Sequence, residues 1–303
     1  IPGIMEHVER TGIHSGDSIA VYPATHIDDD LKLMIIDTTK QLCKGLNATG
    51  IVNIQYIISK RQIYIIEVNP RASRTVPYLS KVTGVPMVDL AVKVSLGEKL
   101  KDLGYGTGVY RTSAYTAVKV PVFSFEKLID VDTQLGPEMK STGEALGGDV
   151  TLEKALYKAL LASGVKIPTH GNVLLTIADE DKEEGLLIAK RFSAIGYGIL
   201  ATKGTADYLQ AHGLYVKTVQ KIDAHEETME NVLDVIRKGH VNYVINTMSQ
   251  KKEVTMDGFL IRRVAAENSV SCFTSFDTAN AMLKVLESMN FTTISMNELA
   301  DAC

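Results

Sequence analysis

The chain has 303 residues, of which 45% are hydrophobic and 22% are charged, with a formal net charge of -4. This composition supports a sizeable core and about two domains. Charged residues form no block of one sign, which argues against a nucleic-acid or anionic-membrane surface. No apolar run reaches the roughly 20 residues that span a bilayer.

The cysteine pattern indicates the compartment. Cys43, Cys272 and Cys303 are odd in number, far apart and without metal-type spacing. Scattered thiols of this kind are typical of a reducing environment, so we expect a cytoplasmic protein. The chain begins Ile1-Pro2-Gly3 without a methionine, which suggests a fragment of a longer protein.

The first half of the chain mixes short apolar runs with helical patterns. We expect strands at 19–23, 51–58 and 63–68, helices at 30–43, 75–83 and 87–96, a polar turn at 59–62, and a glycine-rich connector at 132–150.

The second half alternates strands with helices. We expect strands at 173–177, 197–202, 215–219, 241–246 and 271–273, and helices at 181–195, 206–212, 228–238 and 276–289. Such alternation predicts a parallel sheet that is covered on both faces. The change of pattern near 163–166 divides the chain into domains at 1–163 and 164–303.

Oxygen-bearing side chains meet on the predicted hairpin. A turn centred near Arg61 places Gln55 opposite Glu67, and Asn69 lies two residues further along the same strand. Such ligands suit Mg²⁺, and Arg71 would complement the phosphates that this ion binds. The alternative is that Glu67 and Asn69 end an edge strand in solvent, while Arg71 pairs with a carboxylate.

The amino-acid sequence of this region resembles that of a known family. The sequence Ile66-Glu67-Val68-Asn69-Pro70-Arg71, followed by Ser73-Arg74-Thr75-Val76-Pro77, resembles the metal-binding end of the ATP-grasp domain in carbamoyl-phosphate synthase large subunits. Upstream, Gly3-Ile4-Met5-Glu6-His7 and Gly12-Ile13-His14-Ser15-Gly16-Asp17-Ser18 are similar to the segment that lines the ATP site in that family.

The resemblance implies specific roles. ATP would be contacted by Gly12, Ile13, His14, Ser15, Gln55 and Glu67; Mg²⁺ or Mn²⁺ would be held by Gln55, Glu67 and Asn69; Arg71 would be the catalytic phosphate contact. Without the resemblance, His14 is equally a turn or helix cap and Ser15 part of a solvated loop.

A second candidate site follows the strand at 197–202. Thr202-Lys203-Gly204-Thr205 is predicted to form a tight loop that opens a helix, where free N–H groups and the helix dipole attract an anion. The plain alternative is that Thr205 is an N-cap and Gly204 a turn glycine.

Other polar residues follow neighbouring strands. Lys182, Lys221 and the pair Asn246-Thr247 come after the strands at 173–177, 215–219 and 241–246. In an open parallel sheet, ligands bind at the carboxyl ends of the strands, so these groups are expected to converge. The alternative for Lys182 and Lys221, each considered alone, is that the side chain is a solvated surface charge.

This half resembles the methylglyoxal-synthase-like domain that ends the same family. The resemblance implies that an allosteric nucleotide such as UMP is surrounded by Lys182, Thr202, Thr205, Lys221, Asn246 and Thr247. True methylglyoxal synthases carry a catalytic Asp-Pro pair where this chain reads Asn246-Thr247. We therefore expect binding rather than lyase chemistry.

The predicted fold class is α/β, with a partial ATP-grasp domain of mixed or antiparallel sheets followed by a Rossmann-like, methylglyoxal-synthase-like domain. The resemblance implies synthesis of carbamoyl phosphate from bicarbonate, glutamine-derived ammonia and ATP, for pyrimidine and arginine biosynthesis, with a small glutaminase subunit as partner. No nucleic-acid or membrane partner is expected.

The chain by itself is expected to be inactive, because the earlier half of an ATP-grasp site would precede Ile1 and phosphoryl transfer needs the whole set of positioned groups. Three alternatives stay open: another ATP-grasp ligase such as a biotin carboxylase or purine-pathway enzyme, a methylglyoxal-synthase-type lyase, and a non-enzymatic nucleotide sensor.

Overall fold

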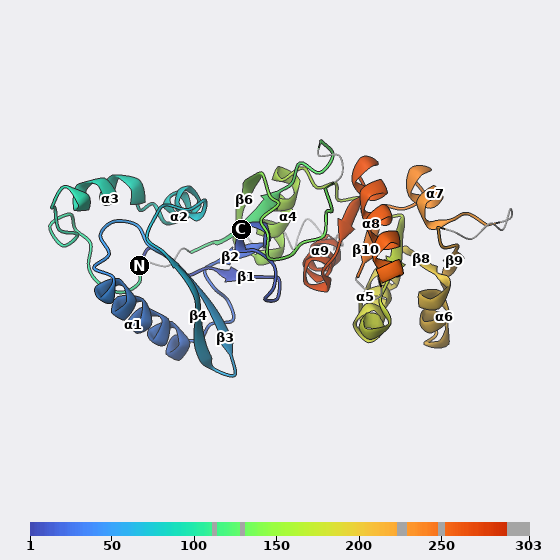
Figure 1. The fold of residues 1–303 in the computed structure, drawn as a ribbon, viewed down its shortest axis with the longest axis horizontal. Helices are drawn as coiled ribbons and strands as arrows, with labels where there is room; N and C mark the ends of the chain where they lie inside the picture. Colours follow the sequence, from blue (N-terminus) through green and yellow to red (C-terminus); the bar gives the residue numbers. More distant parts are fainter. Residues whose placement is uncertain (111–113, 128–130, 223–228, 248–251, 290–303) are drawn as a thin grey trace, which may run out of the picture. The chain divides into compact units, whose positions relative to one another are not determined.

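A computed structural model describes residues 1–110, 114–127, 131–222, 229–247 and 252–289, the side chains of 252–255 excepted (Figure 1). The chain forms two compact units. The first unit comprises Ile1–Ile129 and Leu135–Val165, and the second comprises Asp130–Gln134 and Lys166–Cys303. The sequence does not predict that Asp130–Gln134 belongs with the second unit.

The first unit contains two antiparallel sheets. One sheet has the order β1-β2-β5-β6, and β3 and β4 form a separate hairpin. The elements of the first unit are β1 (Glu6–His7), β2 (Ala20–Tyr22), α1 (Asp29–Gly45), β3 (Asn53–Ser59), β4 (Gln62–Asn69), α2 (Thr75–Thr83), α3 (Met87–Ser95), β5 (Thr116–Val122), β6 (Gly143–Asp149) and α4 (Leu152–Ala162).

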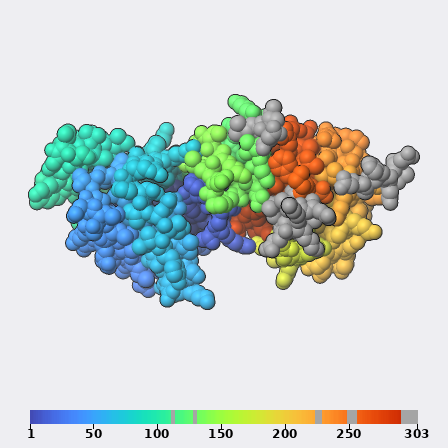
Figure 2. Space-filling view, in the orientation of Figure 1, coloured from blue at the N-terminus to red at the C-terminus, as the bar shows by residue number. Residues whose placement is uncertain are grey.

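The hairpin turns on two residues. Lys60 and Arg61 both have positive φ, 48° and 61°, as a tight two-residue hairpin turn requires. This turn pairs Tyr56 with Ile65, but the register then shifts and pairs Gln55 with Glu67. A β-bulge therefore brings about the predicted opposition of Gln55 and Glu67. In the space-filling view, the tip of the hairpin projects from the first unit (Figure 2).

The prediction of a connector throughout 132–150 is wrong at its end, because Gly143–Asp149 is strand β6 and pairs with β5. Its glycines serve packing rather than turning. A Cβ on Gly147 would collide with the carbonyl oxygen of Ala155 and the backbone nitrogen of Ala159 in α4. Glycine facing two buried alanines lets α4 lie close against the strand.

The second unit is a five-stranded parallel sheet of order β11-β10-β7-β8-β9. Its elements are β7 (Asn172–Thr176), α5 (Lys182–Ala194), β8 (Gly198–Thr202), α6 (Lys203–Ala211), β9 (Lys217–Val219), α7 (Val232–Arg237), β10 (Tyr243–Asn246), α8 (Lys252–Glu267), β11 (Ser271–Phe273) and α9 (Phe276–Ser288). Helix α8 is not among the helices that the sequence predicts. The predicted α/β fold class is confirmed.

Helices cover both faces of the parallel sheet. Leu174, Leu200 and Val244 form one core with apolar residues of α7 and α8. Helix α5 contacts α6 and α9, and Arg191 of α5 pairs with Glu287 of α9. The chain order runs outward from β7 in both directions, so the topological switch point lies between β7 and β10, where open parallel sheets bind ligands.

In the part of the chain that the structure describes, no helix is both long and apolar enough to cross a membrane.

Candidate functional sites

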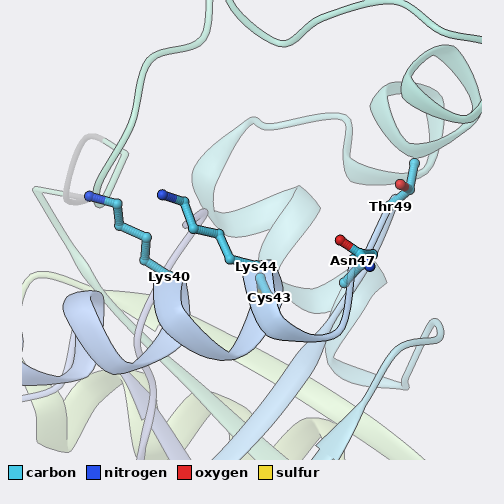
Figure 3. Close-up of a pocket in the computed structure, with 6 residues that line it drawn as sticks. Lys40, Cys43, Lys44, Asn47 and Thr49 are labelled. Carbon is cyan, nitrogen blue, oxygen red and sulfur yellow. The ribbon is translucent and has the colours of Figure 1, made fainter.

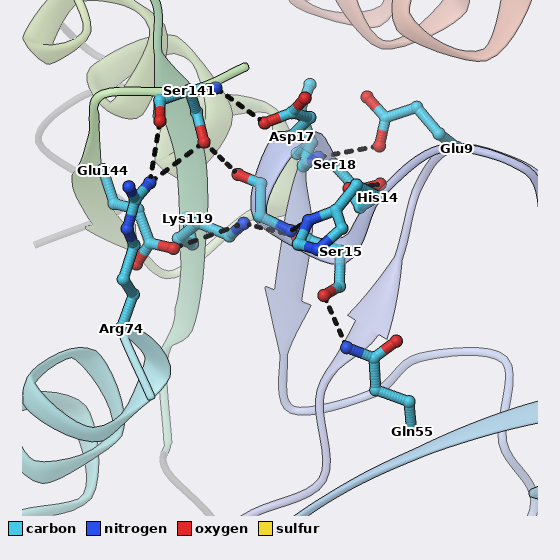
Figure 4. A network of polar contacts seen from close by, with 12 residues as sticks. Glu9, His14, Ser15, Asp17, Ser18, Gln55, Arg74, Lys119, Ser141 and Glu144 are labelled. Atoms are coloured by element: carbon cyan, nitrogen blue, oxygen red, sulfur yellow. Dashed lines mark hydrogen bonds and ion pairs between the residues drawn. The ribbon is translucent and has the colours of Figure 1, made fainter. Parts of the chain in front are cut away.

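The loop before β2 contacts the hairpin. Gln55 Nε2 on β3 donates a 2.5 Å hydrogen bond to Ser15 Oγ (Figure 4). Because Ser15 Oγ accepts this bond, its own proton is still available for donation, and the amide oxygen of Gln55 points away from the serine. Two residues that the sequence predicts to share an ATP site therefore lie together.

His14 is a cap. Its Nδ1 accepts a 3.0 Å hydrogen bond from the backbone of Gly16 at the start of the short 3₁₀ helix Ser15–Asp17. A ring nitrogen that accepts carries no proton, so neutral His14 is protonated on Nε2 and presents a donor there. The neighbouring Gly12 has φ 112°, which favours glycine, and Ile13 is half-buried.

A buried lysine, Lys119, binds the backbone of the loop that contains Ser15. Lys119 Nζ on β5 donates to the carbonyl oxygen of Ser15 at 3.0 Å and lies 3.7 Å from a carboxylate oxygen of Glu144 on β6 (Figure 4). Burial, the largest influence, lowers the pKa of Lys119, while Glu144 opposes that shift. The lysine fixes the backbone from which the Ser15 side chain projects.

A carboxylate holds the other side of the loop. The side chain of Asp17 is 1% exposed and accepts backbone hydrogen bonds of 2.8 Å from Lys140 and Ser141. Ser141 Oγ donates to the carbonyl oxygen of Gly16 and accepts from Arg74 (Figure 4). Asp17 and Ser141 therefore join the loop to the segment that precedes β6.

The predicted metal ligands lie at one end of the hairpin. Gln55 pairs with Glu67, and Asn53 pairs with Asn69, so the four side chains form two adjacent cross-strand pairs. No group of three His, Cys, Asp or Glu residues suited to a metal occurs among the described residues. One carboxylate with amide oxygens fits a hard cation that also binds waters and phosphate oxygens.

Arg71, the predicted phosphate contact, lies just beyond β4. Its side chain is exposed, and one guanidinium nitrogen donates to the carbonyl oxygen of Ala72 at 3.1 Å. The structure therefore places Arg71 two residues from Asn69 but turned onto its own loop.

The first unit also has a surface hollow of about 560 Å³ at the end of α1 (Figure 3). It is lined by Lys40, Cys43, Lys44, Asn47, Ala48 and Thr49. None of the predicted site residues lines it, and we assign it no function.

In the second unit the predicted loop before α6 is wrong. Strand β8 ends at Thr202, which is the N-cap of α6, and the helix begins at Lys203. Gly204 and Thr205 therefore lie in the first helical turn. A Cβ on Gly204 would have only Lys182 Nζ within 4 Å, at 3.9 Å. The fold itself does not require glycine here, and the helix N-terminus keeps open space beside it.

Lys182 lies next to this helix start. It begins α5, its Nζ is 2.8 Å from Asp179, and it lies 5.8 Å from the ring centroid of Tyr208 in α6. A partly buried ammonium beside the positive end of a helix favours an anion.

Two threonines flank the end of β7. Thr205 Oγ1 is within 3.4 Å of the backbone nitrogen of Ile177, and Thr247 Oγ1 accepts from the backbone nitrogen of Ala178 at 2.9 Å. Thr247 follows β10, so its bond crosses the switch point between β10 and β7. The structure therefore brings Thr205 and Thr247 to the end of β7, and Lys182 lies beside the start of α6, which follows Thr202.

Asn246 is 3% exposed, as buried as Thr205. Its Nδ2 donates to Thr176 Oγ1 at 2.8 Å, and its Oδ1 accepts from Arg262 at 2.7 Å. Because arginine only donates, this contact fixes which way the amide points. Arg262 is 1% exposed and also binds both carboxylate oxygens of Asp132, at 2.9 and 2.8 Å.

The backbone of α8 makes room for this arginine. A Cβ on Gly258 would lie 2.9 Å from Arg262 Nη1 and 3.4 Å from Asn246 Oδ1. Glycine in a helix interior lowers helix stability by about 1 kcal/mol relative to alanine. At position 258 this loss accompanies the space that the guanidinium of Arg262 occupies.

Lys221 is exposed and follows β9, the edge strand of the sheet. Among the described residues, no contact joins Lys221 to the other predicted nucleotide ligands. The structure thus places Thr205, Asn246 and Thr247 around the ends of β7 and β10, and Thr202 and Lys182 at the start of α6.

Sequence reasoning missed Lys119 and Arg262 as supporting residues. Lys119 had a signal, because it is a lone charge in the apolar run Ala117-Val118-Lys119-Val120. Arg262 had none in the absence of a predicted helix, since its partner Asp132 is 130 residues away in the chain.

Two family models match parts of the chain. Residues 3–103 match the family described as "Carbamoyl-phosphate synthase L chain, ATP binding domain", and residues 184–274 match the "MGS-like domain". Each match covers less than half of the chain. The ATP-binding match contains the Ser15–Gln55 contact and the hairpin end, and the second contains both Thr205 and Asn246.

Two solved structures are similar to part of the chain. A single-chain, multi-domain long-chain acyl-CoA carboxylase is 16% identical, with 48% of this chain and 18% of that chain covered and a TM-score of 0.39. The biotin carboxylase domain of a single-chain bacterial carboxylase is 18% identical, with 48% and 39% covered and a TM-score of 0.39. The match thus spans well under two thirds of either carboxylase, and similarity at this level carries no argument.

Proposed function

We propose that this chain is part of the large subunit of a glutamine-dependent carbamoyl-phosphate synthase, an ATP-dependent carbon–nitrogen ligase. The observation that carries the proposal is the order of the two family matches, an ATP-binding domain of that synthase followed by an MGS-like domain. Another ATP-grasp ligase would account for the first match only.

In this proposal the first unit supplies one wall of an ATP site, with ATP as substrate. Ser15 and the Nε2 of His14 present donors toward phosphate oxygens, and Lys119 keeps their backbone in place. Mg²⁺ or Mn²⁺ would be held by Gln55, Glu67 and Asn69, and would neutralise charge on the phosphates. Arg71 would have to turn away from Ala72 to reach them.

The second unit is proposed to bind a regulatory nucleotide, with UMP as the first candidate. Its phosphate would lie at the start of α6, where Lys182 and open space beside Gly204 meet the helix N-terminus. Lyase chemistry is disfavoured, because the residue in the place of the catalytic acid is Asn246 and both ends of its amide are bonded within the protein.

The pathway, the glutaminase partner and the cytoplasmic location are parts of the same proposal. They rest on the resemblance, the family matches and the scattered cysteines.

The ligase proposal is tested in the whole large subunit by measuring ATP formation from carbamoyl phosphate and ADP. We expect Glu67→Gln to slow this reaction about a hundredfold, because a charge that stabilises phosphoryl transfer is lost. Glu98→Gln, at an exposed position of the same unit, is the matched control and should leave the rate unchanged. A wild-type subunit that forms no ATP contradicts the proposal.

A further inference from the structure

Arg262 joins three parts of the second unit that are far apart in the chain. From α8 it reaches Asp132 through two hydrogen bonds and Asn246, at the end of β10, through a third. Asn246 in turn bonds Thr176 at the end of β7. This chain of contacts, buried at Arg262 and Asn246 and about one third exposed at Asp132, leads from Asp132 to the switch point of the sheet.

The position of Asp132 makes this chain of contacts unusual. Segment Asp130–Gln134 belongs to the second unit, whereas the residues on both sides of it belong to the first unit. Asp132 Oδ1 also accepts from the backbone nitrogen of Gln134 at 3.0 Å, which fixes the carboxylate against residues 132–134. The carboxylate is thus tied both to its own segment and to the guanidinium.

We propose that Arg262 is a positioning residue that couples the nucleotide site to segment Asp130–Gln134. It fixes the orientation of the Asn246 amide at the end of β10, and the same guanidinium binds the carboxylate of Asp132. The inference rests on the proposed nucleotide site of the second unit. Any ligand that favours the ordered strand end then also favours the Asp132–Arg262 pair, because coupling between two sites is reciprocal.

The geometry also explains why lysine cannot replace this arginine. A guanidinium offers a planar fork to a carboxylate and a further N–H to the amide, whereas an ammonium is a single point charge. Gly258 leaves the space that this fork occupies. Arg262→Lys therefore keeps the charge opposite Asp132 and loses the fixed geometry of Asn246.

The test is calorimetric titration of UMP into the 303-residue chain and its Arg262→Lys and Asp132→Asn variants. We expect the Kd for UMP to rise about tenfold in both, although Asp132 is not one of the predicted nucleotide ligands. Arg263→Lys is the matched control, because Arg263 lies next on α8 and pairs with exposed Glu267. Its Kd should equal that of the wild type.

A purely structural role for Asp132 predicts a different result. Asp132→Asn would then lower the melting temperature and leave the Kd for UMP unchanged, and this outcome overturns the inference.

A second arm works without ligand and separates this inference from the proposed function. Hydrogen exchange of residues 131–134 is compared between the wild type and Asn246→Ala, and the coupling predicts faster exchange in the variant. Unchanged exchange overturns the inference. Wild-type protein that binds no UMP overturns the nucleotide site instead, and the exchange result then decides the coupling alone.

Discussion

Gln55 donates a hydrogen bond of 2.5 Å to Ser15, 40 residues earlier in the chain. This bond joins the β3–β4 hairpin to the loop that Lys119 and Asp17 hold against β5 and β6. Two segments of the same wall of the proposed ATP site are therefore joined by one amide and one hydroxyl.

Removing either partner of this bond tests that link. Gln55→Ala and Ser15→Ala should each lower the free energy of unfolding by about 1 kcal/mol, the usual net value of such a bond. In urea denaturation, the double variant should lose clearly less than the sum of the two, because the shared bond is lost only once. Ser95, which bonds Ala91 within α3, should show no coupling to Gln55.

Lys119→Met should be far more damaging. It leaves the Ser15 carbonyl without its donor and the largely buried Glu144 without its cation, at a cost of about 3–5 kcal/mol in the free energy of unfolding. Lys127→Met, at an exposed position, is the control and should be nearly neutral. Chemical denaturation measures both, and equal stabilities would refute the supporting role of Lys119.

The same lysine predicts an alkaline trend. Burial lowers the folded-state pKa of Lys119, so the cost of burying its charge is fully present below that pKa and disappears above the ordinary value of 10.5. Wild-type stability should therefore rise with pH in this window relative to Lys119→Met. A difference that stays constant with pH would contradict the lowered pKa.

Arg191 and Glu287 connect α5 to α9 and predict an acid trend. Two hydrogen bonds of 2.8 and 2.9 Å from Arg191 lower the pKa of Glu287 below its ordinary value of 4.5. The stability they add is full above 4.5 and is lost as pH falls through the lowered pKa. Because both side chains are about one third exposed, Glu287→Gln should cost about 1 kcal/mol or less at neutral pH.

Thermal unfolding across pH measures this effect. The melting temperatures of wild type and Glu287→Gln should converge in strong acid, and a gap that persists there would count against the ion pair.

Gly204→Ala should separate folding from binding. Its backbone is helical and nothing but Lys182 Nζ lies near the added methyl, so the variant should be more stable by about 0.4–1 kcal/mol. The methyl would stand beside the first N–H groups of α6, so UMP affinity should fall about tenfold. Gly196→Ala is the contrast, because φ 91° makes that substitution destabilising.

A Gly204→Ala variant that binds UMP as tightly as the wild type would mean that the phosphate lies elsewhere.

Much of the fold follows from local pattern. Helix α2 has the predicted bounds, 75–83, and the five parallel strands were recognisable because apolar runs alternate with amphipathic segments. Strand β6 was not predicted because its glycines indicate a loop. Gly147 is needed for close packing against α4, which the sequence of the strand itself does not reveal. Helix α8 was not predicted because Gly258 weakens the helical pattern. This glycine leaves space for the side chain of Arg262.

The site was predictable where it follows strand ends and the hairpin. Gln55 opposite Glu67 agrees with the prediction, although the turn lies half a residue earlier and a bulge restores the register. Lys119, Asp17 and Ser141 act through contacts between segments more than 100 residues apart, which no local pattern encodes.

The proposed nucleotide site is tested most directly by calorimetric titration of UMP into the 303-residue chain, with Lys182→Ala and Thr205→Ala variants and with Lys190→Ala, on the same helix as Lys182, as a control. We expect saturable binding by the wild type and by Lys190→Ala, and binding at least tenfold weaker in the other two. A folded wild-type chain that binds no UMP, or that binds it equally well in all four forms, would contradict the proposed site.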